Sequence, residues 1–243
     1  MHSVSNGAAT QSDTTLISGD FAGLSATFSP EGFLIPVPQH LVPEALLEWG
    51  QAPSCLEVIV SEQILADERT IERQTVTVYP AVGCGVDNLD TSKVIECIRW
   101  ASKASSDSAI AMDYEISDKK VRTETIFALP NNHRLRLILD LINQQVQSPI
   151  RVNLERRTST TSTRGTISDG GGLDGRTVSR LLGDELNSGT QFSDEVVEQV
   201  NDGTIRLPRG ISFALNGDSL TIRHENQSIM RSYRKDGSVA IDI

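Results

Sequence analysis

Cysteine is scarce in this chain, and its placement argues against two kinds of scaffold. The 243 residues contain three cysteines, Cys55, Cys84 and Cys97, which form no CxxC pair and are odd in number. A disulfide framework and a zinc site are both disfavoured, because each needs paired or clustered ligands. We therefore expect reduced thiols, as in an intracellular or plastid-stromal compartment.

Long apolar runs are also missing. No stretch approaches the ~20 consecutive apolar residues that a membrane-spanning helix needs. The first fifteen residues are polar and lack the hydrophobic core of a secretory signal. The sequence therefore predicts a protein that neither spans a membrane nor is secreted. The Ser and Thr content of this stretch suits the remnant of a plastid transit peptide, and equally a flexible tail.

Positive charge is in deficit. The formal net charge is −10, from 22 Lys and Arg against 32 Asp and Glu. A nucleic-acid surface needs a basic stripe, and anionic lipids attract Lys and Arg. The balance argues against both partners and favours an acidic surface that keeps the protein in solution.

Motifs of catalysis and metal binding are absent as well. The four histidines stand apart in sequence, without an HExxH or HxH pair, and no GxSxG elbow is present. The loop at Gly170–Gly175 lacks the GK[ST] ending of a phosphate cradle and the regular acidic ligands of a calcium loop. We expect no metal and no catalytic residue, and an enzyme is the less favoured class.

What the sequence does contain is alternation with a period of two. In Arg134–Leu141 the leucines at 135, 137, 139 and 141 fall on one side of an extended chain. In Ile150–Glu155 the apolar residues at 150, 152 and 154 likewise fall on the side opposite the polar residues at 151, 153 and 155. Such alternation is typical of an antiparallel sheet with one buried and one solvent-exposed face, so Arg134, Arg136 and Arg151 are expected on the wet face.

Similar strands and hairpin turns occur along most of the chain. Asn216-Gly217 and Asp236-Gly237 are strong hairpin signals, and Pro43–Trp49 predicts a short helix. We predict an all-β fold: an antiparallel β-barrel with one short helix and a long Gly/Ser/Thr-rich loop region. Residues 1–20 are expected to be a flexible N-terminus and 21–243 one domain, with a mobile insert at about 158–190. Whether Val178–Leu186 forms a helix is left open.

A barrel that holds a ligand offers a second interpretation of its strand arginines, because an inward guanidinium pairs a carboxylate well. On this interpretation the candidate ligand contacts combine cationic or hydroxyl groups for an acidic head group with an indole for stacking. They are Trp100, Arg136, Arg231 and Tyr233.

Three segments resemble an uncharacterised, lipocalin-like domain family of cyanobacteria, algae and plants. They are Phe28–Pro38 with Val42–Trp49, the loop Gly170–Gly175, and the closing strands Leu207–Ile211 and Met230–Ser238. That family is similar in fold to the S-type phycobiliprotein chromophore lyases, which hold a bilin in a lipocalin-like barrel. The resemblance implies a lipocalin-like barrel with a cavity, a plastid or cyanobacterial cytoplasmic location, and a bilin, another tetrapyrrole or a lipid as ligand. It does not imply lyase activity.

Function therefore has three candidate classes. The first is a binding protein for a small apolar or tetrapyrrole ligand, acting in pigment handling or photosynthetic-complex assembly with a pigment protein as partner. The second is lyase-like transfer of a chromophore. The third is a ligand-free assembly or scaffold protein with a filled barrel. A collapsed interior favours the scaffold, and an apolar-lined mouth favours the binding protein.

Overall fold

The computed structural model describes residues 16–82, 89–117, 120–158, 173–183, 186, 192, 203–234 and 238–243. Strands make up most of this part of the chain, which confirms the all-β prediction. The strands are β1 (Gly19–Phe28), β2 (Leu34–Ile35), β3 (Leu56–Ile64), β4 (Thr70–Val78), β5 (Thr91–Arg99), β6 (Ser102–Ser105), β7 (Ala109–Ser117), β8 (Lys120–Leu129), β9 (His133–Ile142), β10 (Gln145–Arg157), β11 (Thr204–Arg206), β12 (Ile211–Asn216), β13 (Ser219–His224), β14 (Gln227–Tyr233) and β15 (Val239–Asp242).

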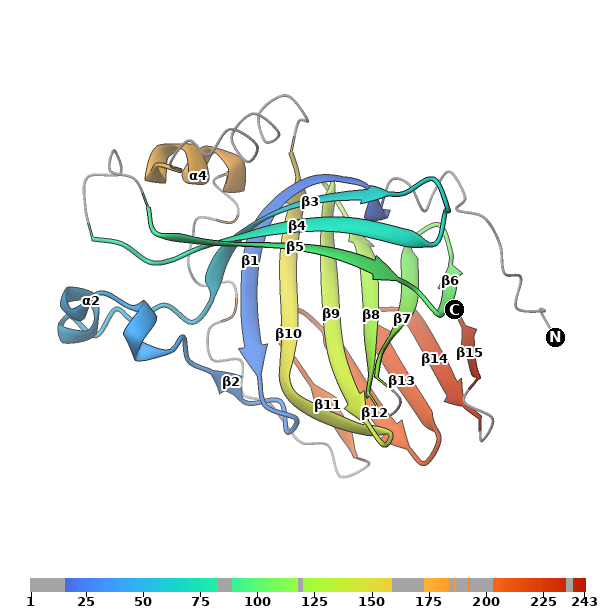
Figure 1. The fold of residues 1–243 in the computed structure, drawn as a ribbon. Coiled ribbons are helices and arrows are strands. Elements are labelled where there is room, and N and C mark those ends of the chain that lie inside the picture. Colours follow the sequence, from blue (N-terminus) through green and yellow to red (C-terminus); the bar gives the residue numbers. More distant parts are fainter. Residues whose placement is uncertain are drawn as a thin grey trace.

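Ten strands form one antiparallel sheet, in the order β5-β4-β3-β1-β10-β9-β8-β7-β6, with β2 paired to β1. The sheet curls on itself, so that β3, β4 and β5 cross in front of β1, β10, β9 and β8 (Figure 1). Side chains from the two walls meet inside: Arg73 on β4 bonds Glu124 on β8, although four strands separate β4 from β8 in the sheet. The sheet is therefore a half-barrel with an interior of its own.

One end of the half-barrel is closed by the chain itself. The edge strands β5 and β6 are joined by only Trp100 and Ala101. The backbone N–H of Trp100 donates to the Arg69 carbonyl at 3.1 Å, and that of Ala101 donates to the Asp113 carbonyl at 2.7 Å. This corner defines the closed end. The open end is the opposite end of the same strands, where β4 ends at Val78 and β5 begins.

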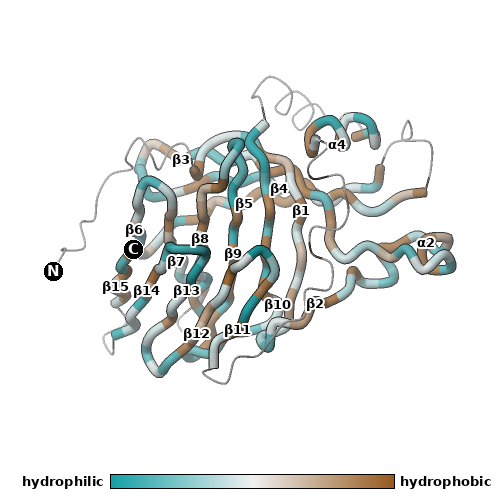
Figure 2. The backbone as a smooth tube through the Cα atoms, turned by 180° about the vertical axis from the view of Figure 1, so that it is seen from behind, coloured by the Kyte–Doolittle hydropathy of each residue, from teal (hydrophilic) through white to brown (hydrophobic). Residues whose placement is uncertain are grey.

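The second sheet has five strands in the order β11-β12-β13-β14-β15, and its β15 lies beside β6 (Figure 1). It packs on the outer face of the half-barrel through one large apolar core. The leucines of β9 at 135, 137, 139 and 141 enter this core, as their alternation predicted. Phe213, Leu220, Ile222 and Ile229 face them from the second sheet. Hydrophobic and hydrophilic residues alternate along the strands in Figure 2.

The opposite face of β9 corrects one expectation. Arg134 and Arg136 are only 1% exposed, so the face predicted to be wet is buried too. The alternation was assigned correctly, but the second face points into the half-barrel and not into solvent. The physical reason is that β3 and β4 fold over this face, and carboxylates from β3 and from the neighbouring strands β8 and β10 pair with the arginines, as a buried charge requires.

Among the described residues, two short α-helices, α2 and α4, lie outside the sheets. The predicted helix after Pro43 is present as α2 (Glu44–Glu48), preceded by a 3-10 turn η1 (Gln39–Leu41). Both belong to an arm that leaves the barrel after β2 and returns at β3 (Figure 1). Of the stretch left open, Val178–Leu182 is helical and forms the end of α4 (Gly175–Leu182). The Asp174 side chain caps this helix, accepting from the Thr177 N–H at 2.7 Å.

Several predictions made from the sequence concern residues that the structure does not describe. The first fifteen positions, most of the insert expected at about 158–190, Gly170–Gly172 and the turn Lys235–Gly237 lie outside the described residues. Within the described part of the chain, no helix has the length and hydrophobicity of a membrane-spanning segment.

Candidate functional site

A cluster of six charged side chains lies inside the half-barrel, towards its closed end, where Tyr114 bonds Glu124. They come from five strands, and all are buried. The cluster consists of Glu62 on β3, Arg73 on β4, Glu124 on β8, Arg134 and Arg136 on β9, and Glu155 on β10. Three guanidinium groups face three carboxylates, so the formal charges of the cluster balance. We call this set the ionic cluster.

Arg136 is the centre of the ionic cluster. Its Nη1 lies 2.8 Å from Glu62 Oε1 and 2.7 Å from Glu124 Oε1. Its Nη2 lies 2.7 Å from Glu62 Oε2 and 3.2 Å from Glu155 Oε2. One guanidinium therefore joins strands β3, β8, β9 and β10, which come from both walls of the half-barrel. Charge-assisted bonds of this kind fix geometry as well as contributing energy.

The other two arginines complete the links between walls. Arg73 Nε donates to Glu62 Oε1 at 2.5 Å, and its Nη2 reaches both oxygens of Glu124 at 2.8 and 2.9 Å. Arg134 pairs Glu62 at 2.7 Å and Glu155 at 2.5 Å, and its guanidinium also lies over the Phe21 ring. Glu62 thus contacts all three arginines and is the most connected carboxylate.

The electrostatics of the cluster follow from this pairing. Burial alone would raise the pKa of Glu62, but Arg136, Arg134 and Arg73 hold it well below its ordinary range. Burial likewise opposes the charged form of Glu124, and Arg73 and Arg136 lower its pKa. Both carboxylates are therefore ionised at neutral pH, with no pKa tuned for proton transfer there. The arrangement suits a structural cluster that fills the interior and links the two walls, and not an acid–base site.

Neighbouring residues make room for the cluster and extend it. Gly23 on β1 pairs in register with Glu155, and a Cβ at Gly23 would lie 2.2 Å from the Leu154 carbonyl oxygen and 2.7 Å from Glu155 Cα. Only glycine permits this approach. The Tyr114 hydroxyl donates to Glu124 Oε2 at 3.0 Å, and burial followed by the Glu124 charge raises the pKa of Tyr114 well above its ordinary value.

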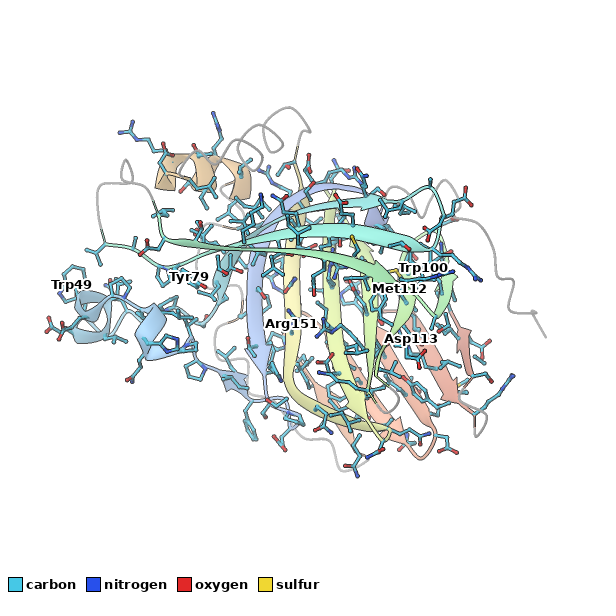
Figure 3. The ribbon with its side chains drawn as sticks, viewed as in Figure 1. Trp49, Tyr79, Trp100, Met112, Asp113 and Arg151 are labelled. Carbon is cyan, nitrogen blue, oxygen red and sulfur yellow. The ribbon has the colours of Figure 1, made fainter. Side chains whose placement is uncertain are left out.

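Trp100 and Arg136, two of the predicted ligand contacts, lie in the filled part of the half-barrel. Arg136 belongs to the ionic cluster, where its charge is balanced by carboxylates of the chain. Trp100 packs in the apolar cluster of the closed end with Met112, Ile71 and Tyr114. Figure 3 shows Trp100 at the end of β5, well apart from Arg151.

Arg231 and Tyr233, the other two predicted contacts, belong to β14. Arg231 is fully buried against the outer face of the half-barrel. Its Nε donates to Asp113 Oδ1 at 3.0 Å, and its Nη2 donates to Thr125 Oγ1 at 2.9 Å. Burial, followed by the Asp113 charge, raises the pKa of Tyr233. The structure brings Arg231 and Tyr233 together near Asp113, between the sheets. It does not gather the four predicted contacts around one cavity, and their role as ligand contacts stays a prediction.

A cavity of about 280 Å³ lies at the open end. Its walls come from β1, β3, β4 and β10, and both ends of the arm between β2 and β3 cover one side. The lining residues are Ser25, Thr27, Ile35, Pro36, Val37, Pro38, Ser54, Cys55, Leu56, Val58, Thr77 and Arg151. The surface is therefore mainly aliphatic, with hydroxyl groups and one guanidinium.

Strand register explains why these residues meet. Thr27 pairs with Arg151 of β10 on one side and with Ile35 of β2 on the other, which sets the three in one row. Ser25 pairs with Leu56, and Val58 with Thr77, in rows deeper along the same face. Side chains two apart on a strand share a face, so the alternation that carries Glu155 into the ionic cluster carries Arg151 into the cavity.

Arg151 differs from the other interior arginines in its partners. It is only partly buried, and its guanidinium makes no hydrogen bond or ion pair with any described residue. Burial, followed by repulsion from Arg122, lowers the pKa of Arg151. The nearby Asp140 is already engaged, because Arg122 Nε and Lys120 Nζ each lie 2.8 Å from its oxygens. Figure 3 labels Arg151 on β10, away from Trp100 and the closed end.

Of the four hydroxyl groups that line the cavity, only that of Ser54 has a partner, the thiol of Cys55. Ser25, Thr27 and Thr77 form no side-chain hydrogen bond to a described residue. Cys55 also lines the cavity, and burial raises the pKa of its thiol to about 11, so it is neutral at physiological pH. The cavity thus presents neutral donors and acceptors around a single positive charge, which is a binding surface and not a nucleophilic site.

Sequence reasoning placed Arg151 on a solvent-exposed face, and the structure corrects this. The alternation of Ile150–Glu155 is visible in the sequence, but the wall that covers it is not, because β3 and β4 lie roughly 75 to 95 residues earlier in the chain. The signal that could have pointed to the site is the polar content of the matching face of β1, where Ser25 and Thr27 alternate with buried Leu24 and Ala26.

No protein-family model matches the chain, and no curated protein shows significant similarity to it. Among solved structures, the chain is similar to a protein of unknown function from the DUF3598 family of Nostoc punctiforme. The identity is 14% and the TM-score 0.43, over 92% of this chain and 93% of that one. That protein comes from a cyanobacterium, and its unknown function brings no ligand or activity to this chain.

Proposed function

We propose that the protein binds a small, largely apolar molecule in the cavity at the open end of the half-barrel. The observation that carries this proposal is the cavity of about 280 Å³ with aliphatic walls and unused hydroxyl groups. Ligand sites are concave and mainly apolar, with a few polar groups that orient the ligand, and typically enclose about 300–1,000 Å³. The cavity lies just below this range, so it suits a small ligand or one end of a larger one.

The scaffold alternative draws support from the other end of the molecule. The ionic cluster and the apolar cluster around Trp100 fill the closed end of the half-barrel. A filled interior is what a ligand-free scaffold needs. The cavity at the open end is different, because Arg151 and three of its four hydroxyl groups lack side-chain partners among the described residues. Binding at the open end therefore accounts for more of the observations than a scaffold role alone.

The tetrapyrrole version of the proposal rests on the sequence resemblance. A tetrapyrrole is larger than the cavity, so only one edge of it would enter while the remainder lay against the open end. Pigment handling with a pigment protein as partner follows only from this version. Covalent transfer of a bilin is the third candidate, and incubation with a bilin and an apo-phycobiliprotein tests it against a protein-free control.

The cheapest test of binding uses the uncharged dye Nile red, whose fluorescence rises in apolar surroundings. We expect a saturable increase with the wild-type protein. Thr77→Phe fills the cavity from β4 and should abolish most of the increase, whereas Thr91→Phe on the neighbouring strand β5 does not line the cavity and should leave it intact. Ser25→Leu fills the cavity from β1 and is the second variant if Thr77→Phe misfolds.

Circular dichroism and urea unfolding establish that each variant folds before its dye binding is compared. Absence of saturable binding to the wild-type protein would contradict the proposal. So would equal binding to wild-type protein and to both folded cavity-filling variants, because the dye would then sit elsewhere.

A further inference from the structure

We infer that the cavity selects ligands bearing one carboxylate, which pairs with the guanidinium of Arg151, so that the ligand class is an aliphatic or otherwise apolar monocarboxylic acid. This inference rests on the proposed function, because it uses the same cavity. It adds the chemical group that the ligand must carry and the residue that recognises it.

The first step of the argument is the contrast among arginines on the interior face. Arg73, Arg134 and Arg136 each contact two or three carboxylates, and Arg122 pairs with Asp140 at 2.8 Å. Arg151 points to the same interior and contacts no described acidic side chain. A charge removed from bulk water is costly unless it is paired. The fold therefore holds a cation whose partner the described residues do not supply.

The second step concerns the surroundings of Arg151. Its row neighbour Thr27 and the next hydroxyl, Ser25, lie on β1 beside it, and both are free to donate to an anion. Beyond them the walls are Ile35, Leu56 and Val58. A polar corner in which hydroxyl groups that can donate lie beside a cation, continuing into aliphatic walls, matches a carboxylate joined to an apolar chain.

The third step limits the charge of the head group. A phosphate monoester carries about −1.5 to −2 at neutral pH, more than one guanidinium balances. Lys120 and Arg122, the nearby cations, are already paired with Asp140. The protein as a whole has a net charge of −10, so any excess negative charge on a ligand is disfavoured at long range. A single carboxylate fits both limits.

The experiment compares three probes with the same alkyl chain: decanoate, decanol and decyl phosphate. Displacement of Nile red or titration calorimetry gives the dissociation constant of each for the full-length protein. We expect decanoate to bind about tenfold to a hundredfold more tightly than decanol, because a hydrogen bond to a charged partner contributes that much. Decyl phosphate should bind more weakly than decanoate.

Three variants locate the effect. Arg151→Gln should reduce decanoate affinity to the level of decanol and leave decanol binding unchanged. Arg151→Lys keeps the charge and should restore part of the preference. Arg122→Gln is the matched control, since it removes a neighbouring arginine that is paired with Asp140, and it should leave the preference for decanoate in place.

The outcomes separate the two claims. If decanol and decanoate bind equally and Arg151→Gln changes neither, the inference is overturned while the proposed function stands. If decyl phosphate binds most tightly, carboxylate selectivity is overturned. If no probe binds and Nile red is not taken up, the proposed function fails, and the inference fails with it.

Discussion

The two ends of the half-barrel use the same residue type in opposite ways. At the ionic cluster, Arg136 contacts Glu62, Glu124 and Glu155, so its charge is satisfied by the fold. At the open end, Arg151 occupies the same face of the next strand and contacts no described carboxylate. A buried arginine with partners holds walls together, and one without partners is available to a ligand. The presence of carboxylate partners, more than the degree of burial, therefore distinguishes a structural arginine from one that can bind a ligand in this protein.

The largest expected effect is at the ionic cluster. Glu62→Gln removes the carboxylate that all three arginines share and leaves excess positive charge in a buried site. Breaking a buried ion pair by removing one partner costs about 3–5 kcal/mol. We expect a loss of this size in the free energy of unfolding, measured with urea. A loss below about 1 kcal/mol would contradict the structural role of the ionic cluster, since the cluster would then contribute no more to stability than a surface pair.

Acid should weaken the closed end in the same manner. The folded-state pKa values of Glu62 and Glu124 are lowered from 4.5, so their ion pairs contribute stability above this value. Stability is then lost as the pH falls below about 4.5 towards the folded-state pKa values, because the unfolded state takes up protons first. Unfolding free energy measured from neutral pH down to pH 3 should show this decline. In Glu62→Gln the decline should be shallower, and an unchanged slope would argue that other carboxylates cause it.

A smaller effect is expected at Gly23, whose missing side chain makes space for Glu155. Gly23→Ala places a Cβ against backbone atoms of β10, which cannot move aside as a flexible side chain can. Forcing extra atoms into a packed interior typically costs about 1–3 kcal/mol. Urea unfolding of Gly23→Ala and of Ser25→Ala, two residues along the same face, gives the comparison. Equal stability of the two variants would show that the strands separate easily at this point.

The smallest effect is expected at the paired residues of the open end. Asp140→Asn removes the partner of Arg122 and Lys120, but all three side chains are partly exposed. Exposed and partly exposed pairs contribute only about 0–1 kcal/mol. A thermal or urea midpoint close to that of the wild-type protein is expected. A loss comparable with that of Glu62→Gln would mean that the open end is as tightly built as the closed end.

Much of the fold could be predicted from local patterns. Alternation located the strands of the meander, the leucine face of β9 entered the core as expected, and the helix after Pro43 formed. These features depend on residues close together in sequence. The burial of Arg134 and Arg136 could not be predicted in this way, because their partners Glu62 and Glu124 lie on other strands, and Glu62 is more than seventy residues away.

The candidate site shows the same limit. One interpretation of the strand arginines was that some point inward and pair with the carboxylate of a ligand, and Arg136 and Arg231 were the candidates. Both pair instead with carboxylates of the chain. Arg151 has the same alternation as Arg134 and Arg136, so periodicity could not separate them. What separates them is how far along the strand each lies from the closed end. That depends on the curl of the sheet, which no local pattern encodes.

The central claim is that Arg136 stabilises the fold whereas Arg151 binds a ligand. It is tested most directly by urea unfolding with and without decanoate. Arg136→Gln should lose about 3–5 kcal/mol, as for any broken buried pair, whereas Arg151→Gln should lose nothing or gain slightly, because it removes an unpaired charge. Decanoate should raise the unfolding midpoint of the wild-type protein and leave that of Arg151→Gln unchanged. Equal losses in the two variants, or equal stabilisation of Arg151→Gln and wild-type protein by decanoate, would contradict the account.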